Sequence, residues 1–356
     1  MFADWLIYGA NGYTTELVLE LLAARGLHPI LAGRREESIR PIAEKFGLAY
    51  RLFALDDPAA VKKGIEGVRV VVNLAGPYSR TAKPMVEACI ATGAHYLDIT
   101  GEIDVFEWVM SKRAEAERAG CVLISGVGFD VVPTDCLAKM LAEAMPDARE
   151  LELAFSPFGS GGAGVSRGTL KTMLENIGRG ARVRIDGEIR AVPFDWRTPR
   201  IRFAQGERSC VTLPWGDVST AFHSTGIPNV CVYMAAPGSF ARTMRILRPV
   251  IAPAPVHRAL QWIVTRAMTG PDRAHREKSA SGIWGRVTNA AGDTVEATLT
   301  CPEGYTLTAE STLAALDRVL AGGARPGAWT PSVAFGADFV RGLSNVWVSE
   351  LRAGRR

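Results

Sequence analysis

A glycine turn near the start of the chain holds the first residues that could do chemistry. Residues 6–8 read as an apolar strand, the Gly-Ala-Asn-Gly run at 9–12 as a turn, and the residues after it as an amphipathic helix. Gly9 permits the sharp change from strand to helix. Gly12 has no Cβ, so a pyrophosphate can approach the backbone amides at the helix N-terminus. With a second apolar strand ending at Gly33, the segment predicts half of a dinucleotide-binding βαβ unit.

The expected contacts to the dinucleotide begin in this turn and continue into the helix. They are Gly9, Ala10, Asn11, Gly12, Tyr13 and Thr14. The usual pattern has a third glycine where this chain has Thr15, so we expect Thr15 to pack close to the strand. The alternative for this segment is a structural turn that binds no ligand.

The end of the second strand selects between the two nicotinamide dinucleotides. An NAD site needs an aspartate or glutamate there, which accepts hydrogen bonds from the ribose 2′-hydroxyl. Here Gly33 is followed by Arg34 and Arg35, and the first acid is Glu36. A guanidinium can bind a 2′-phosphate and also stack on adenine. We therefore expect NADP(H) rather than NAD(H), the alternative being that these arginines are solvated loop residues.

When a cofactor transfers a hydride, the protein must donate or accept the one proton that accompanies it. The candidate residues for this step are Tyr78, Asp98, Glu102 and Asp130. Tyr78 could donate a proton, the pair Asp98 and Glu102 could orient a substrate amine or a water, and Asp130 could bind substrate. The structural alternatives are packing for the tyrosine and helix capping or loop hydrogen bonds for the acids.

The loop before Tyr78 belongs with the cofactor contacts. It follows an apolar strand at about residues 68–74 and consists of Ala75, Gly76 and Pro77. Ligands of open α/β sheets bind outside the carboxyl ends of the strands, so this loop should lie near the nicotinamide.

Strand and helix patterns alternate through the first third of the chain. Strands are expected at about residues 49–55, 68–74, 95–99 and 121–125, and helices at about 13–24, 36–46, 83–92 and 105–119. This alternation predicts an α/β architecture with a Rossmann-type, doubly wound parallel sheet over residues 1–129.

Strand patterns dominate residues 130–330, which predict an α+β second domain for substrate binding and dimerisation, with a mixed or antiparallel sheet. Hairpin turns are expected at Asp186-Gly187 and Gly292-Asp293, and helices at about 169–177, 257–268 and 307–320. The C-terminal residues 331–356 could pack back on the first domain.

Composition argues against several other classes of protein. The net charge of +4 is small and the basic residues are dispersed, so no nucleic-acid partner is expected. The cysteines form no C-x-x-C pair and the histidines no H-x-x-x-H pair, so neither a disulfide framework nor a metal site is expected. No membrane helix or leader is apparent, and we expect a cytoplasmic protein. The sequence leaves a homodimer open.

Two other enzyme classes have partial signatures in the chain. Residues 164–168 match the G-x-S-x-G elbow of serine hydrolases, but a glycine-rich run precedes them instead of the apolar strand that the elbow needs. The glycine-rich segment 159–168 could instead cover a substrate or cradle an anion. No tyrosine has a lysine four positions later, which argues against short-chain dehydrogenase chemistry.

Five motifs give the chain a resemblance to the saccharopine dehydrogenase-like oxidoreductases. They are YGANGYT at 8–14, LAGR at 31–34, AGPY at 75–78, YLDITGE at 96–102 and GFDVVPTD at 128–135. The chain is most similar to the branch that contains bacterial trans-acting enoyl reductases. It departs from that pattern at Thr15, where relatives usually have glycine.

The resemblance implies an NADP(H) cofactor, a Rossmann-type N-terminal domain and a substrate domain that closes over the nicotinamide. The implied reaction is hydride transfer to or from an imine or amino acid, or an enoyl or acyl substrate, bound between the domains. The alternative is a catalytically inactive NADP(H)-binding sensor or scaffold protein.

Overall fold

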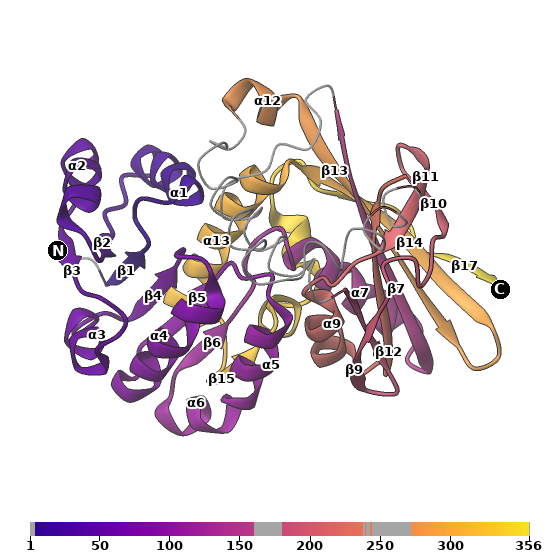
Figure 1. Cartoon of the computed structure of the whole chain (residues 1–356), viewed down its shortest axis with the longest axis horizontal. Helices are drawn as coiled ribbons and strands as arrows, with labels where there is room; N and C mark the ends of the chain where they lie inside the picture. The colour runs from indigo at the N-terminus through magenta and orange to yellow at the C-terminus, as the bar shows by residue number, and fades with distance from the viewer. Residues whose placement is uncertain (1–3, 160–179, 238, 240–242, 244–271, 356) are drawn as a thin grey trace. The chain divides into compact units, whose positions relative to one another are not determined.

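The structure is a computed structural model that describes residues 4–159, 180–237, 239, 243 and 272–355 (Figure 1). The chain divides into two compact units. The first unit comprises Met1–Val132 and Tyr305–Gly336, and the second comprises Pro133–Gly304 and Ala337–Arg356.

The first unit is built on a parallel sheet of seven strands in the order β15-β6-β5-β4-β1-β2-β3. The strands are β1 (Trp5–Tyr8), β2 (Ile30–Gly33), β3 (Tyr50–Leu52), β4 (Val70–Asn73), β5 (His95–Asp98), β6 (Val122–Ile124) and β15 (Gly327–Trp329). Read from β3, the order is 3-2-1-4-5-6, that of the doubly wound dinucleotide-binding fold. The predicted fold class is therefore confirmed, and the order reverses between β1 and β4.

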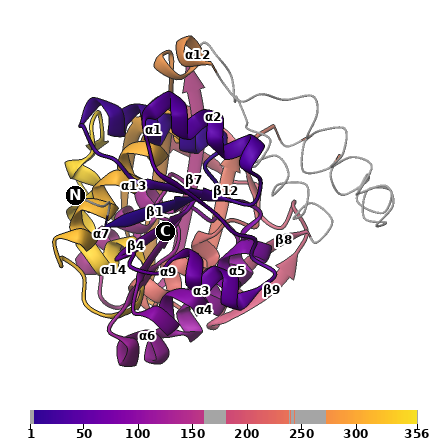
Figure 2. The same cartoon turned by 90° about the vertical axis from the view of Figure 1, so that its left-hand side faces the viewer.

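Helices cover both faces of this sheet. They are α1 (Tyr13–Ala24), α2 (Glu36–Phe46), α3 (Pro58–Gly64), α4 (Tyr78–Thr92), α5 (Ile103–Ser111), α6 (Arg113–Ala119), α13 (Gly304–Leu320) and α14 (Pro331–Phe335). Helices α1 and α2 lie on one face and α3 to α6 on the other (Figure 2). Strands β1 and β4 are consequently buried along their whole length, which explains their continuous apolar runs.

Two predicted helices differ from those in the structure. The helix expected at about 83–92 begins at Tyr78, because the carboxylate of Glu102 accepts hydrogen bonds from the first backbone amides of α4. The helix expected at 105–119 is two helices, α5 and α6, with Lys112 between them. The bounds of α1 and α2 agree with the prediction.

The second unit contains a mixed sheet in the order β10-β11-β12-β7-β13-β14-β16. Its strands are β7 (Ala148–Gly159), β8 (Ala181–Ile185), β9 (Glu188–Val192), β10 (Arg200–Phe203), β11 (Gly206–Thr212), β12 (Asn229–Ala235), β13 (Ser279–Asn289), β14 (Asp293–Pro302), β16 (Trp347–Val348) and β17 (Arg352–Arg355). Only β12 and β7 pair in parallel among the described strands of this sheet. Both predicted hairpins are present, as β8–β9 and β13–β14.

Few helices accompany this second sheet in the described part of the chain. They are α7 (Val132–Ala144), α9 (Asp217–Thr225), α12 (Arg273–Glu277) and the 3-10 helix η1 (Ala337–Gly342). Residues Leu137 and Leu141 of α7 pack against Gly285 of β13, where a Cβ would lie 2.7 Å from Leu141 Cδ1. The glycine therefore allows close packing of helix on strand.

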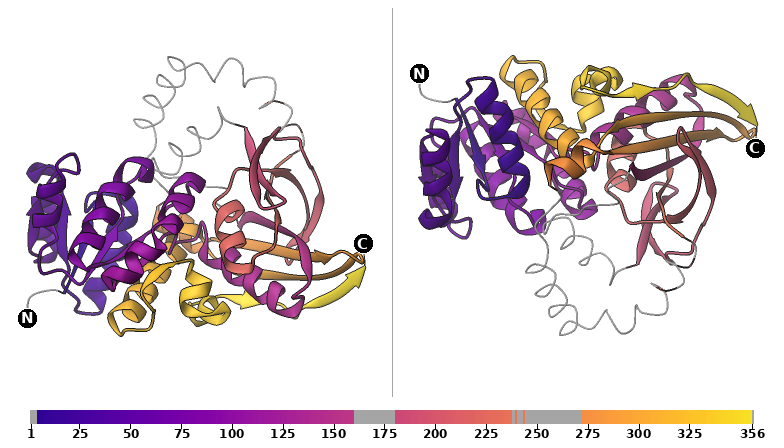
Figure 3. Two further views of the ribbon diagram at one scale, coloured as in Figure 1. Left: turned by 90° about the horizontal axis from the view of Figure 1, so that it is seen from below. Right: turned by 90° about the horizontal axis from the view of Figure 1, so that it is seen from above.

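The chain returns to the first unit earlier than the sequence predicts. Strand β15 hydrogen-bonds in parallel to β6, so residues 305–336 belong to the first unit rather than to a second domain ending at 330. Strands β16 and β17 instead pair with β14, which keeps the C-terminal residues in the second unit (Figure 3). The expected return of 331–356 to the first domain therefore applies only to the short helix α14.

Some predictions lie outside the described residues. They are residues 160–168 of the glycine-rich segment and the helices expected at 169–177 and 257–268. Among the described helices, none combines the length and apolar character that crossing a membrane requires.

Candidate active site

The glycine turn after β1 lies against the loop after β4. Gly9 has a φ of 94°, and a Cβ there would lie 2.8 Å from the backbone nitrogen of Ala75. Any side chain would therefore be strained and would collide with the neighbouring loop. The contact brings together the two loops that flank the point where the strand order reverses, which is where ligands of such sheets bind.

The N-terminus of α1 fits a pyrophosphate. Gly12 precedes the helix, and no side chain caps it. Backbone amides in the first turn of an uncapped helix attract an anion. Thr15, in the place of the third glycine, is completely buried, and its hydroxyl donates a hydrogen bond of 2.9 Å to the carbonyl oxygen of Gly9. The expectation that Thr15 packs close to the strand is thus confirmed, and the residue stabilises the turn.

The other predicted contacts in this turn differ in exposure. Ala10 is buried, with its backbone amide 3.4 Å from the carbonyl oxygen of Ala32, whereas Asn11 is exposed. Tyr13 and Thr14 are half-buried in the first turn of α1. Asn11, Tyr13 and Thr14 therefore retain surface with which a ligand could interact.

Two arginines follow β2 with exposed side chains. Neither Arg34 nor Arg35 forms a side-chain hydrogen bond or ion pair with another residue that the structure describes. Glu36, the nearest acid, is bound by the guanidinium of Arg40 and by the hydroxyl of Tyr50, at 2.9 Å. The hydrogen bond from Arg40 lowers the pKa of Glu36. Glu36 is thus occupied by its own partners, whereas the guanidinium groups of Arg34 and Arg35 are exposed. This end of β2 therefore suits the 2′-phosphate of NADP(H) better than the ribose 2′-hydroxyl of NAD(H).

Asp98 lies at the end of β5, completely buried, and accepts four hydrogen bonds. One carboxylate oxygen accepts hydrogen bonds from the backbone amides of Thr100 at 3.0 Å and Gly126 at 2.9 Å. The other oxygen accepts hydrogen bonds from the hydroxyls of Tyr96 at 2.8 Å and Ser125 at 3.0 Å. Burial raises the pKa of Asp98, and these hydrogen bonds oppose the rise. This carboxyl therefore ties the end of β5 to the loop after β6.

Asn73 is a site residue that the sequence prediction missed. It is completely buried at the end of β4, its amide nitrogen lies 3.1 Å from the Tyr96 hydroxyl, and its carbonyl oxygen accepts the backbone amide of Ala75 at 3.1 Å. It links the β4 loop to the hydrogen bonds around Asp98. The available signal was a polar residue directly after the apolar run Val70–Val72.

Glu102 fixes the start of α4. Its two carboxylate oxygens accept the backbone amides of Tyr78 at 2.8 Å and Ser79 at 2.9 Å. The structural alternative predicted for this acid was helix capping. Glu102 does cap a helix, but that helix is α4, which precedes Glu102 in the chain. Tyr78 is consequently held in a first helical turn and is buried rather than lying in an open loop.

Burial shifts the pKa values of both Tyr78 and Asp130. Burial raises the pKa of Tyr78 well above its ordinary value, and the negative charges of Asp98, Glu102 and Asp130 raise it further. Burial alone raises the pKa of Asp130 to about 7. The tyrosine therefore stays protonated at neutral pH, while the aspartate can both give and accept a proton.

The carboxyl group of Asp130 lies over Gly101. A Cβ at Gly101 would lie 2.6 Å from Asp130 Oδ2, so only glycine leaves room for this position. Tyr78, Asp98, Glu102 and Asp130 are thus gathered at the carboxyl edge of β4, β5 and β6. The four candidates for proton transfer, scattered in sequence, share one edge of the sheet.

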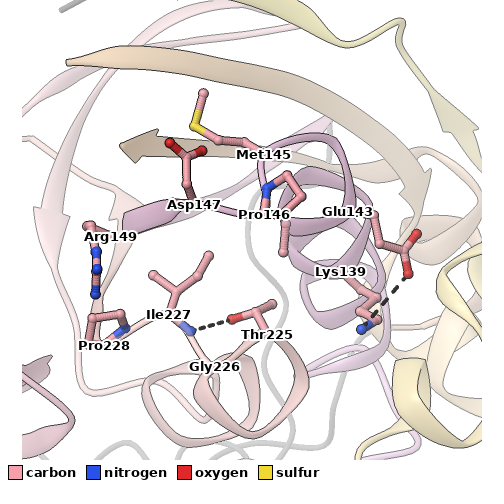
Figure 4. Close-up of a pocket in the computed structure, with 12 residues that line it drawn as sticks. Lys139, Glu143, Met145, Pro146, Asp147, Arg149, Thr225, Gly226, Ile227 and Pro228 are labelled. Carbon is pink, nitrogen blue, oxygen red and sulfur yellow. Dashed lines mark hydrogen bonds and ion pairs between the residues drawn. The ribbon is translucent and has the colours of Figure 1, made fainter. Parts of the chain in front are cut away.

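A separate hollow lies in the second unit, between the end of α7 and the end of α9 (Figure 4). Lys139 at its border lies 3.9 Å from Glu143 and donates a hydrogen bond of 3.3 Å to the carbonyl oxygen of Ser224. None of the predicted cofactor or proton-transfer residues lines it.

Comparisons with known proteins show what the first part of the chain is similar to. Residues 5–124 match the saccharopine dehydrogenase NADP binding domain. Trans-acting enoyl reductase of Mycobacterium leprae is 31% identical over 158 residues, which cover 42% of this chain and 38% of the relative. Human saccharopine dehydrogenase-like oxidoreductase is 28% identical over 201 residues, which cover 50% of this chain and 47% of the relative. The matches thus span less than half of either relative.

A solved structure extends the likeness to the whole chain. Apo saccharopine dehydrogenase (L-Glu forming) from Saccharomyces cerevisiae has a TM-score of 0.67 and 14% identity, and the match covers 99% of this chain and 100% of that one. This match shows a shared fold. The family of the first domain confirms the expected cofactor, NADP(H). Residues 5–124 are therefore similar to the NADP-binding domain of saccharopine dehydrogenase.

Proposed function

We propose that the chain is an NADP(H)-dependent oxidoreductase in which Asp130 manages the proton that accompanies hydride transfer. The observation that carries this proposal is the partly buried carboxyl group with a pKa of about 7 at the ligand-binding edge of an NADP-binding sheet. A general acid–base group works best when its pKa is near the working pH. The names of the relatives, an enoyl reductase and a dehydrogenase-like oxidoreductase, agree with this class of reaction.

The cofactor would be held by the residues around the glycine turn. The amides at the start of α1 would bind the pyrophosphate, and Arg34 with Arg35 would bind the 2′-phosphate. Residues Ala75, Gly76 and Pro77 would border the nicotinamide half, since they follow β4 beside the turn. When bound, NADPH supplies a hydride to a carbon atom of the substrate.

Asp130 would complete the reduction. In its protonated form it donates a proton to the imine nitrogen, or to the carbon next to the one that receives hydride in an enoyl substrate. The resulting carboxylate regains a proton from water. In the oxidative direction the carboxylate accepts the proton instead. Imines and enoyl groups both need one hydride and one proton, so both substrate classes fit this step.

The remaining candidates would orient Asp130 and the substrate. Tyr78 stays protonated and can donate a hydrogen bond to a substrate oxygen or nitrogen. The carboxylate oxygens of Glu102 accept hydrogen bonds at the start of α4, and those of Asp98 accept four hydrogen bonds from β5 and the loops after β5 and β6. We therefore assign these two acids to positioning rather than to proton transfer.

The test combines cofactor affinity with turnover. NADPH binding is measured by calorimetry, and NADPH consumption is followed with imines, with keto acids plus an amine, and with enoyl thioesters. We expect consumption with one of these classes, a loss of at least about 100-fold in Asp130→Asn, and an unchanged Kd for NADPH. Tight NADPH binding without consumption across the panel would contradict the proposal and favour a sensor or scaffold role.

A further inference from the structure

Helix α13 lies beside the candidate site although it comes from far beyond the family's NADP-binding domain in sequence. It runs alongside α1. The rings of Tyr13 and Tyr305 meet edge to face with centroids 5.0 Å apart, and Arg25 lies 3.2 Å from Asp317. Both ends of α1 are therefore in contact with this second helix.

The same helix hydrogen-bonds to the loop that carries Asp130. The Thr308 hydroxyl oxygen accepts the backbone amide of Phe129 at 2.9 Å. Ser311 lies one turn after Thr308 in α13, and its hydroxyl donates a hydrogen bond of 2.7 Å to the carbonyl oxygen of Val127. Thr308 and Ser311 are both buried, so water does not readily replace either contact.

The loop is held from its other side by β5. The backbone amide of Val127 donates to the carbonyl oxygen of Asp98 at 2.8 Å, and Gly126 donates to the Asp98 carboxylate. Gly128 lies between the two supports, because a Cβ there would lie 2.9 Å from Thr308 Cγ2 and 3.3 Å from Ile99 Cβ. Residues 126–129, which directly precede Asp130, are thus held by hydrogen bonds from β5 on one side and α13 on the other.

We propose that Thr308 is a positioning residue for the carboxyl group of Asp130, so that α13 is a functional part of the site. The catalytic meaning of this role rests on the proposed function. Without the hydroxyl of Thr308, the partly buried amide of Phe129 has lost its acceptor. The loop then shifts toward water or another acceptor, and the carboxyl group moves from its place over Gly101.

The chain offers a matched control on the same helix. Thr312 is completely buried one turn after Thr308, and its hydroxyl has no hydrogen-bond partner among the described residues. Thr308→Val and Thr312→Val make the same chemical change in two buried positions. Thr308→Ser restores the hydroxyl that Thr308→Val removes.

The experiment follows the titration of Asp130 in the full chain. The probe is the carboxyl carbon signal of 13C-labelled aspartate, assigned by its loss in Asp130→Asn. The ionisable groups gathered with Asp130 are Tyr78, Asp98 and Glu102, and none of them is altered. We expect Thr308→Val to move the midpoint toward that of an ordinary aspartate by at least about 0.5 pH unit, because the carboxyl group becomes more hydrated. Thr308→Ser and Thr312→Val should keep the wild-type midpoint.

An unchanged midpoint in Thr308→Val, or an equal change in Thr312→Val, would overturn the proposal. If Thr308→Val does not fold, Thr308→Ala removes the same hydroxyl and is compared in the same way with Thr312→Ala, and an unchanged midpoint in Thr308→Ala again overturns the proposal. This readout needs no substrate. A shifted midpoint in a chain that consumes no NADPH would therefore defeat the proposed function alone.

Discussion

Asp130→Asn should stabilise the protein, and increasingly so as the pH rises. Burial raises the pKa of Asp130 from 3.8 to about 7, so the folded chain holds a proton that the unfolded chain has lost over this pH range. Stability contributed by the protonated group is therefore lost as the pH rises from about 4 to about 7. Asparagine has a similar shape and does not ionise, so the free energy of unfolding of the variant does not fall in this way as the pH rises.

The size of the effect follows from the two pKa values. They differ by about 3, and each pH unit corresponds to about 1.4 kcal/mol, so ionisation of Asp130 costs up to about 4 kcal/mol at about pH 8. The cost at about pH 5 is less than half of this, because that pH lies only about one unit above the ordinary aspartate pKa of 3.8. The advantage of the variant over the wild type should thus grow by about 2–3 kcal/mol between these pH values.

Urea unfolding of the full chain at a series of pH values measures this difference. Amide exchange in β5 assigns the transition to the unit that contains Asp130. The control is Glu20→Gln, an exposed acid on α1 in the same unit, which should keep the wild-type pH dependence. Parallel pH profiles for Asp130→Asn and the wild type would refute the argument that Asp130 is costly to ionise.

The other predictions concern the cofactor, the space over Gly101 and the glycine turn. Arg34→Ala should weaken NADPH binding by about 1–3 kcal/mol and leave NADH binding nearly unchanged in calorimetry; equal weakening of both would exclude a 2′-phosphate contact. Gly101→Ala should displace the carboxyl group of Asp130 toward water and so lower its pKa, as followed by carboxyl NMR. Gly342→Ala, which has open space around it, is the control, and an unchanged Asp130 midpoint in Gly101→Ala would contradict the geometry. Thr15→Val should lower the free energy of unfolding by about 1 kcal/mol through loss of its bond to Gly9, and an unchanged value in urea unfolding would show that the bond contributes nothing.

Local patterns in the sequence predicted much of the first unit. The bounds of α1 and α2 and the run of buried strands follow from apolar periodicity, because each residue's face is set by near neighbours. The glycine turn was predictable for the same reason, since Gly9 needs a positive φ that few other residues adopt. The candidate acids could also be named, because they follow predicted strands.

Partners far apart in sequence could not be predicted in this way. The sequence does not show that β15 joins the first sheet, because an apolar strand has no local mark of the sheet it will enter. Nor does it show that Glu102 caps α4 or that Asn73 supports Tyr96, since each contact joins separate strands or helices. Asp98 and Asp130 look alike as acids in the sequence, and the sequence does not show that Asp98 accepts four hydrogen bonds or that burial raises the pKa of Asp130 to about 7.

The amino-acid sequence by itself determined the dinucleotide-binding half of this protein and the kinds of side chain at its edge. Tertiary structure alone decided which of these acids has its pKa raised to about 7. The physical reason is that the pKa of Asp130 depends on burial, and its surroundings are assembled from α4, β5 and α13. Such burial arises only when segments distant in the chain pack together.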